Sequence, residues 1–204
     1  MIIIKEEDFI GEGGFQKCYA HPNDKNFCIK VITKDINTTR LGYEIKYIKK
    51  ISKRSFNKIE YPFFSKYYKK IETNIGTGYI YDLVRDEDTG EVSKTMADYL
   101  LDETPKFSDE TLQQAFDKLL TLMIKHRVIA NDLYSNNICC KVLKNGTIEM
   151  ILIDGLGHKD LIPFAEWFRF LTKQKVERRV LRDHLKDFTK QREMLIKQKL
   201  DKNK

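Results

Sequence analysis

Apolar residues follow two kinds of pattern along the chain, one typical of strands and one typical of helices. Short apolar runs bounded by glycine or polar turns predict strands at residues 2–10, 27–32, 64–71 and 78–84. Three- and four-residue spacings predict helices near residues 41–48, 94–101, 108–126 and 163–171, with a last amphipathic segment over residues 176–195. The pattern therefore predicts an α+β fold.

An Asn145-Gly146 pair between two apolar runs predicts a tight two-residue hairpin. Asn137 precedes the first of these runs and Asp154 follows the second, so we expect the hairpin to bring the two together. An amide oxygen and a carboxylate that converge suit a hard cation such as magnesium carrying phosphates. Asp132, on the same loop as Asn137, is placed to orient a hydroxyl group or a water molecule.

A glycine-rich stretch follows the first predicted strand and contains Gly11, Gly13 and Gly14. Glycine lets backbone N–H groups approach phosphate oxygens closely. A tight hairpin turn without a ligand explains such a stretch equally well. No Gly-Lys-Ser or Gly-Lys-Thr follows, so the stretch is not a P-loop.

Lys30 interrupts the apolar run at residues 27–32. A lysine in a buried strand is costly unless it is paired, although a lysine on an edge strand can simply face solvent. Glu44 lies on the apolar face of the helix predicted near residues 41–48, where a carboxylate needs a cation. We expect Lys30 and Glu44 to form a pair.

The composition is that of a globular protein, with 41% hydrophobic and 33% charged residues in 204. This length fits one domain or two small lobes. No apolar run reaches the roughly 18 residues of a membrane span, and the first residues turn acidic at once, unlike a secretory leader. The four cysteines show no metal-binding spacing. Reduced thiols and a cytoplasmic location are therefore expected.

The net charge of +7 resides in the last 32 residues. Residues 173–204 hold 12 lysines and arginines against 5 acids, whereas the preceding residues hold 25 of each. This segment could pack on the rest of the chain, contact an anionic surface such as the inner membrane or a protein partner, or extend into solvent. Nucleic-acid binding is disfavoured, because few aromatic residues alternate with the basic ones.

Taken in order, these candidates resemble the protein-kinase-like superfamily over about residues 2–171. The shortness of the chain and the loop at residues 131–138 look most like the small bacterial YrbL family of PhoP regulatory network proteins, which is similar in turn to lipopolysaccharide core kinases. The resemblance implies a compact two-lobed fold with an N-terminal antiparallel sheet, one αC-type helix and a small, mainly helical C-terminal lobe. It divides the chain into a nucleotide-clamping lobe at residues 1–84, a catalytic lobe at 85–172 and a basic amphipathic helix or tail at 173–204.

The resemblance also implies a role for each candidate residue, with ATP and Mg²⁺ as cofactors. Lys30 would hold the α- and β-phosphates, and Glu44 would hold Lys30. The backbone near Leu83 and Val84 would bind adenine. Asp132 would orient the acceptor hydroxyl or take its proton. Two further groups complete the set: magnesium ligands at Asn137 and Asp154, and phosphate-covering glycines at Gly11, Gly13 and Gly14.

Three departures from the kinase pattern qualify this expectation. Ala130-Asn131-Asp132 replaces His-Arg-Asp, Asp154-Gly155-Leu156 replaces Asp-Phe-Gly, and Gln16 occupies the third glycine position. The arginine that pairs with a phosphorylated activation loop is therefore absent, and regulation by such a loop is not expected. A hydroxyl acceptor on a protein, on the chain itself or on a cell-envelope sugar is expected instead. The alternative is a pseudokinase that binds nucleotide without turnover.

Overall fold

The computed structural model describes residues 1–33, 38–55, 63–157 and 164–202, and they form two compact units. Unit 1 comprises Met1–Phe56 and Ser65–Arg85, and unit 2 comprises Asn57–Phe64 and Asp86–Lys204. The α+β class and the antiparallel sheet expected from the sequence are confirmed.

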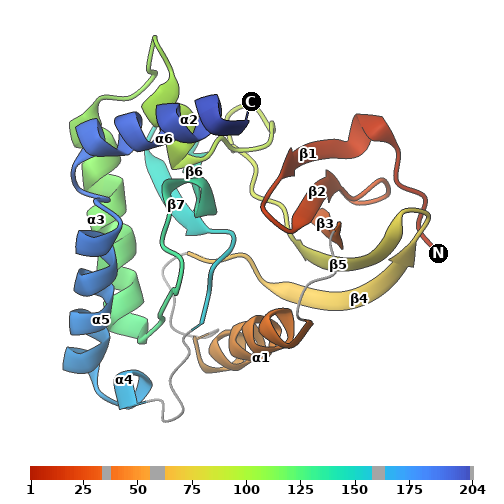
Figure 1. The fold of residues 1–204 in the computed structure, drawn as a ribbon, viewed down its shortest axis with the longest axis horizontal. Helices are drawn as coiled ribbons and strands as arrows, with labels where there is room; N and C mark the ends of the chain where they lie inside the picture. The colour runs from red at the N-terminus through yellow and green to blue at the C-terminus, as the bar shows by residue number, and fades with distance from the viewer. Residues whose placement is uncertain (34–37, 56–62, 158–163, 203–204) are drawn as a thin grey trace. The chain divides into compact units, whose positions relative to one another are not determined.

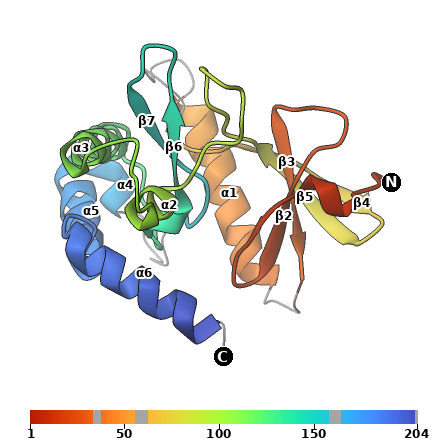
Figure 2. The same cartoon turned by 90° about the horizontal axis from the view of Figure 1, so that it is seen from above.

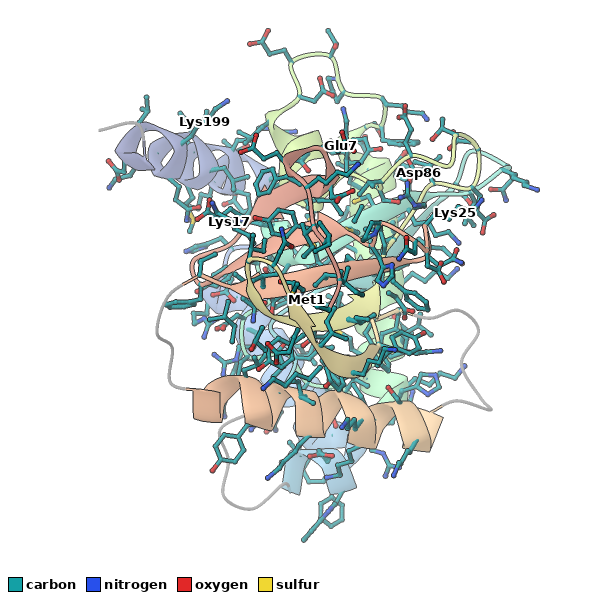
Figure 3. All side chains as sticks on the ribbon, turned by 90° about the vertical axis from the view of Figure 1, so that its right-hand side faces the viewer. Met1, Glu7, Lys17, Lys25, Asp86 and Lys199 are labelled. Carbon is teal, nitrogen blue, oxygen red and sulfur yellow. The ribbon has the colours of Figure 1, made fainter. Side chains whose placement is uncertain are left out.

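Unit 1 is built on a five-stranded antiparallel sheet with strand order β1-β2-β3-β5-β4 (Figure 1). Its strands are β1 (Phe9–Glu12), β2 (Gln16–Ala20), β3 (Phe27–Ile32), β4 (Tyr67–Thr73) and β5 (Gly76–Asp82). Figure 3 labels Lys17, which lies in β2, and Lys25, which lies in the turn between β2 and β3. The strand expected at residues 27–32 is confirmed, and those expected at 64–71 and 78–84 are displaced by two or three residues.

The expectation of a first strand at residues 2–10 is wrong in its first half. Residues Glu6–Asp8 form a short 3-10 helix, in which the Asp8 carboxylate accepts the Lys5 N–H at 2.9 Å. The run of isoleucines before it makes only an isolated parallel bridge, from Ile2 to Thr73. The acidic residues that follow Lys5 favour this turn over a continuous strand.

Opposite faces of β3 have opposite chemistry, because side chains alternate along a strand. Ile29 and Val31 join a buried apolar cluster with Ile4 and Ile80. Lys30 projects to the other face, where its Nζ lies 4.8 Å from the centre of the Tyr81 ring. One face of the sheet is therefore apolar core, and the other carries a buried cation.

Helix α1 (Thr38–Ser55) packs on the face of the sheet that carries Lys30. Lys49 of α1 lies 5.0 Å from the Tyr67 ring centre, and the Tyr67 and Tyr81 rings are 5.4 Å apart. Since Tyr81 also contacts Lys30, α1 and Lys30 share one face of the sheet.

Unit 2 is assembled around the long helix α3 (Asp109–His126). The helix begins at Ser108, whose hydroxyl accepts the Thr111 N–H, and ends at Arg127 in the left-handed conformation. Its apolar face packs against β7, and α3 runs beside α5 (Figure 2). The other elements are α2 (Met96–Leu101), β6 (Ile138–Val142), β7 (Ile148–Leu152), α4 (Phe164–Trp167), α5 (Arg169–Arg182) and α6 (Phe188–Lys202).

The hairpin expected at Asn145-Gly146 is present, but its loop is longer than predicted. Strands β6 and β7 pair up to Val142 and Ile148. Beyond this pair, the Leu143 N–H donates to the Thr147 carbonyl at 2.8 Å. Three residues therefore turn the chain, with Gly146 at φ +80°. This is the common three-residue hairpin with a left-handed glycine.

The single helix expected at residues 163–171 is wrong: Phe168 adopts an extended conformation and separates α4 from α5. Pro163, expected at its start, lies outside the described residues. The C-terminal segment packs into unit 2, because Val176, Val180, Leu185, Phe188 and Leu195 are buried. None of the helices described here is long and apolar enough to span a bilayer.

The four cysteines, all within the described residues, carry thiols rather than disulfides. Cys28, Cys139 and Cys140 are buried, and burial raises the pKa of the Cys140 thiol. A thiol whose pKa is raised stays protonated and is a weak nucleophile. These cysteines behave as small core residues.

Replacement of two glycines of unit 1 by alanine should change the stability of the protein in opposite directions. A Cβ at Gly78 would lie 2.6 Å from a methyl group of buried Ile29, so Gly78→Ala should destabilise the protein by about 1–3 kcal/mol. A Cβ at Gly42, inside α1, meets nothing within 4 Å, so Gly42→Ala should stabilise it by about 0.5–1 kcal/mol. Urea denaturation of both variants measures the two values. Shifts of the same sign would contradict this description of the packing.

Candidate active site in unit 2

Two turns of unit 2 that carry acidic residues are joined through their backbones. The N–H groups of Asn131 and Asp132 donate to the Gly155 carbonyl at 2.8 and 3.4 Å. Gly157 N–H donates to the Ile129 carbonyl at 2.9 Å, and Ala130 pairs with Leu156 in an antiparallel bridge. Asp132 and Asp154 are therefore held on adjoining segments.

Gly155 allows this close approach of the two turns. Its φ of +75° lies in the left-handed region, which favours glycine. A Cβ at this position would overlap the carbonyl oxygen of Asp132. Any larger residue after Asp154 would thus separate the turn from the Asp132 loop.

The amide of Asn137 is oriented by the same loop. Its Nδ2 donates to the Asp132 carbonyl at 2.9 Å, and the backbone carbonyl of Asn137 accepts the Ile153 N–H at 2.9 Å. With Nδ2 held in this way, Oδ1 is the atom that Asn137 can offer as a ligand. Asp154, one residue beyond Ile153, uses its Oδ1 to accept the Gly155 N–H at 2.7 Å.

This donor set fits magnesium. One amide oxygen and one carboxylate, both hard oxygen ligands, come from segments whose backbones are bonded to each other. Magnesium in phosphate-handling enzymes is bound by one or two such protein groups and completes its octahedral shell with phosphate and water oxygens. Asn137 and Asp154 are thus the residues that would hold it.

Asn131 is a site residue that the sequence reasoning did not identify. Arg179 donates from Nη2 to its Oδ1 at 3.2 Å, and Arg182 donates from Nη2 to its carbonyl at 3.3 Å. Both arginines belong to α5, within the basic segment whose contacts the charge pattern left open. No spacing rule links a loop residue to a helix 48 positions further along. Only the tertiary fold brings them together.

In unit 1, Lys30 does not behave as an edge-strand lysine that faces solvent. Strand β3 lies in the middle of the sheet, between β2 and β5, and only 8% of the Lys30 surface is exposed. Glu44 is half-buried on α1, the helix that covers the face on which Lys30 lies. The Lys30–Glu44 pair remains a prediction, and the placement of both residues favours it.

The glycine-rich stretch forms a tight hairpin between β1 and β2, closed by the Gly13 N–H and the Gln16 carbonyl at 2.8 Å. None of Gly11, Gly13 and Gly14 has a left-handed φ, and a Cβ at Gly11 or Gly14 would meet nothing within 4 Å. The conformation of the hairpin therefore does not require glycine there. Close approach of a ligand to the backbone would explain these residues.

The segment expected to bind adenine lies at the end of unit 1. The Leu83 N–H already donates to the Asn26 carbonyl at 2.8 Å, so it is not the donor for an adenine ring. Val84, also expected there, is buried. A backbone donor for adenine would have to come from another residue of this segment.

The fold and the acidic turns define an α+β protein with a candidate site for a phosphate-bound cation. The chain belongs to the family described as PhoP regulatory network protein YrbL, whose model matches residues 2–191. It is 30% identical to the uncharacterized protein YrbL of Escherichia coli (strain K12) over 182 residues, 87% of this chain and 84% of the relative. The protein of the same name from Shigella flexneri gives the same values. The expected membership of the YrbL family is confirmed.

The contact of Gly155 with Asp132 predicts a large difference between two left-handed glycines. Gly146→Ala introduces only the cost of a left-handed alanine, about 1–2 kcal/mol, because a Cβ there meets nothing within 4 Å. Gly155→Ala adds the overlap with Asp132, so it should cost at least about 1 kcal/mol more. Denaturant unfolding of both variants tests this. Equal losses would mean that the two turns are not in close contact.

Proposed function

We propose that the protein is an ATP- and Mg²⁺-dependent phosphotransferase of the protein-kinase-like type that acts on a hydroxyl acceptor. The observation that carries the proposal is the joining of the Asp132 loop to the Asp154 turn, with the Asn137 amide oriented by the same loop. Phosphoryl transfer depends mainly on positioning and on neutralising charge. Three oxygen-bearing side chains on mutually bonded segments suit both tasks.

In this proposal Asp132 acts on the acceptor. Its carboxylate would take the proton of the acceptor hydroxyl as that oxygen bonds to the γ-phosphorus and the bond from this phosphorus to the β–γ bridging oxygen breaks, which leaves ADP. Asn137 and Asp154 would hold the magnesium ion through Oδ1 and a carboxylate oxygen. Bound magnesium and ATP would supply the charge neutralisation and the phosphoryl group.

Unit 1 supports the proposal through Lys30 and the glycine hairpin. A lysine buried in the middle of a sheet carries a cost of desolvation, and binding of an anionic phosphate group would offset part of that cost. The glycines of the hairpin are not required by its conformation, which fits a role in approaching phosphate oxygens.

The acceptor is a hydroxyl of a protein, of the chain itself or of a cell-envelope sugar. The second candidate function is a pseudokinase, favoured by Gln16 at the third glycine position and by Leu156 after Asp154-Gly155. Both candidates bind nucleotide, so turnover distinguishes them. A cytoplasmic location fits either one.

Replacement of Asp132 by asparagine should abolish turnover without abolishing nucleotide binding. Loss of a positioned base lowers rates by about 10²–10⁴-fold, whereas the magnesium ligands and Lys30 stay in place. Release of phosphate or ADP from ATP, with candidate acceptors added, measures the rate, and calorimetry measures binding of ATP. Asp117→Asn, on the exposed face of α3, is the matched control and should keep the wild-type rate.

Two results would contradict the proposal. Turnover by Asp132→Asn at the wild-type rate would exclude this residue as the base. Binding of ATP without any turnover in the wild-type protein, over protein, self and sugar acceptors, would favour the pseudokinase.

A further inference from the structure

The side-chain oxygen and the backbone carbonyl of Asn131, the residue just before Asp132, are both bound by α5. Arg179 donates to the side-chain oxygen at 3.2 Å and Arg182 to the backbone carbonyl at 3.3 Å. The two arginines are three positions apart, so they lie on adjacent turns of one face of the helix. Asn131 is thus held from one side by α5, while its N–H is held by Gly155.

Arg182 is itself fixed in place. Its Nε and Nη2 both donate to the carboxylate of Asp183, which is buried. Its guanidinium carbon lies 6.0 Å from the centre of the Tyr134 ring. The hydrogen bond with Asp183 is the main cause that raises the pKa of the guanidinium, and Tyr134 and Asp132 act in the same direction. Arg182 therefore remains cationic beside the Asp132 loop.

Helix α6 completes the attachment at the far end of the loop. The hydroxyl of Ser135 donates to Oε1 of Gln191 at 3.2 Å, and Nε2 of Gln191 donates to the Asp183 carbonyl. Ser135, Asp183 and Gln191 are all buried. Buried hydrogen bonds of this kind are costly to break, because each loss leaves an unsatisfied polar group. Residues 131–135 are thus bound at both ends by the α5–α6 pair.

We propose that the α5–α6 pair is a positioning element for the Asp132 loop, with Arg179 and Arg182 as its positioning residues. The inference rests on the proposed function, because it assigns these arginines a role in holding the catalytic base. Catalysis requires such a base to be held within a fraction of an ångström. Where kinases carry an arginine in the loop and regulate it by phosphorylation, this chain carries Asn131 and holds it with arginines of α5. The loop is then set by the fold of unit 2, without a modification.

Hydrogen exchange tests the attachment without any need for turnover. In Arg179→Gln and Arg182→Gln, the Asn131 and Asp132 amides should exchange about tenfold faster than in the wild-type protein, because a charged hydrogen bond to the loop is lost. Arg178→Gln is the matched control: Arg178 lies on the exposed face of α5, and its loss should leave these amides unchanged. Unchanged exchange in both test variants, or equal acceleration in Arg178→Gln, would overturn the proposal.

Kinetics test the positioning role. Arg182→Gln should lower kcat at least about tenfold with the KM for ATP unchanged, and Arg182→Lys should restore part of the loss. If Arg182→Gln does not fold, Arg179→Gln provides the same test, since it loses a bond to the Asn131 side chain alone. If the arginine variants exchange faster but the wild-type protein shows no turnover, the attachment holds and the phosphotransferase proposal is wrong. A wild-type kcat in variants whose loop amides exchange faster would contradict the positioning role.

Discussion

The candidate site depends on one backbone contact, the approach of Gly155 to the carbonyl of Asp132. The Gly155 carbonyl accepts the N–H groups of both Asn131 and Asp132, and no side chain larger than hydrogen fits between the two turns. The Asn137 amide then donates to the same Asp132 carbonyl, which fixes its orientation. A single oxygen–glycine contact thus determines where a carboxylate, an amide and a second carboxylate lie. The kinase pattern that the sequence resembles has a phenylalanine after this aspartate, and its absence here does not weaken the geometry, because the glycine makes the contact.

The C-terminal helices of unit 2, α5 and α6, hold the loop that makes this contact. Arg179, Arg182 and Gln191 bind the loop from α5 and α6, and apolar residues of both helices are buried in the unit. The excess positive charge of the chain is therefore partly structural. A truncation before residue 173 would remove the core contacts and the loop contacts together, so its effects would not report on a binding partner alone.

The sequence predicted those features that depend on neighbouring residues. The strand at residues 27–32, the helix at residues 108–126 and the hairpin at Gly146 each have a local signal that the structure bears out. The prediction from sequence was wrong where acidic side chains interrupted an expected strand, at Glu6–Asp8, and where a single extended residue, Phe168, divided an expected helix. It could not find Asn131, since the arginines that bind it are distant in the chain and follow no periodic rule. The YrbL family was identified from the resemblance, and the roles of Lys30, Glu44, Asn137 and Asp154 remain predictions.

The most direct measurement of the central claim is calorimetric titration of ATP with and without magnesium, on the wild-type chain and on Asp154→Asn. Asparagine preserves the size of the side chain and an oxygen for the Gly155 N–H, but it removes the negative charge that would hold the ion. We expect binding to the wild-type chain to require magnesium and to be at least about tenfold weaker in the variant. Magnesium-independent binding that is equal in both proteins, or no binding to the wild-type chain, would contradict it.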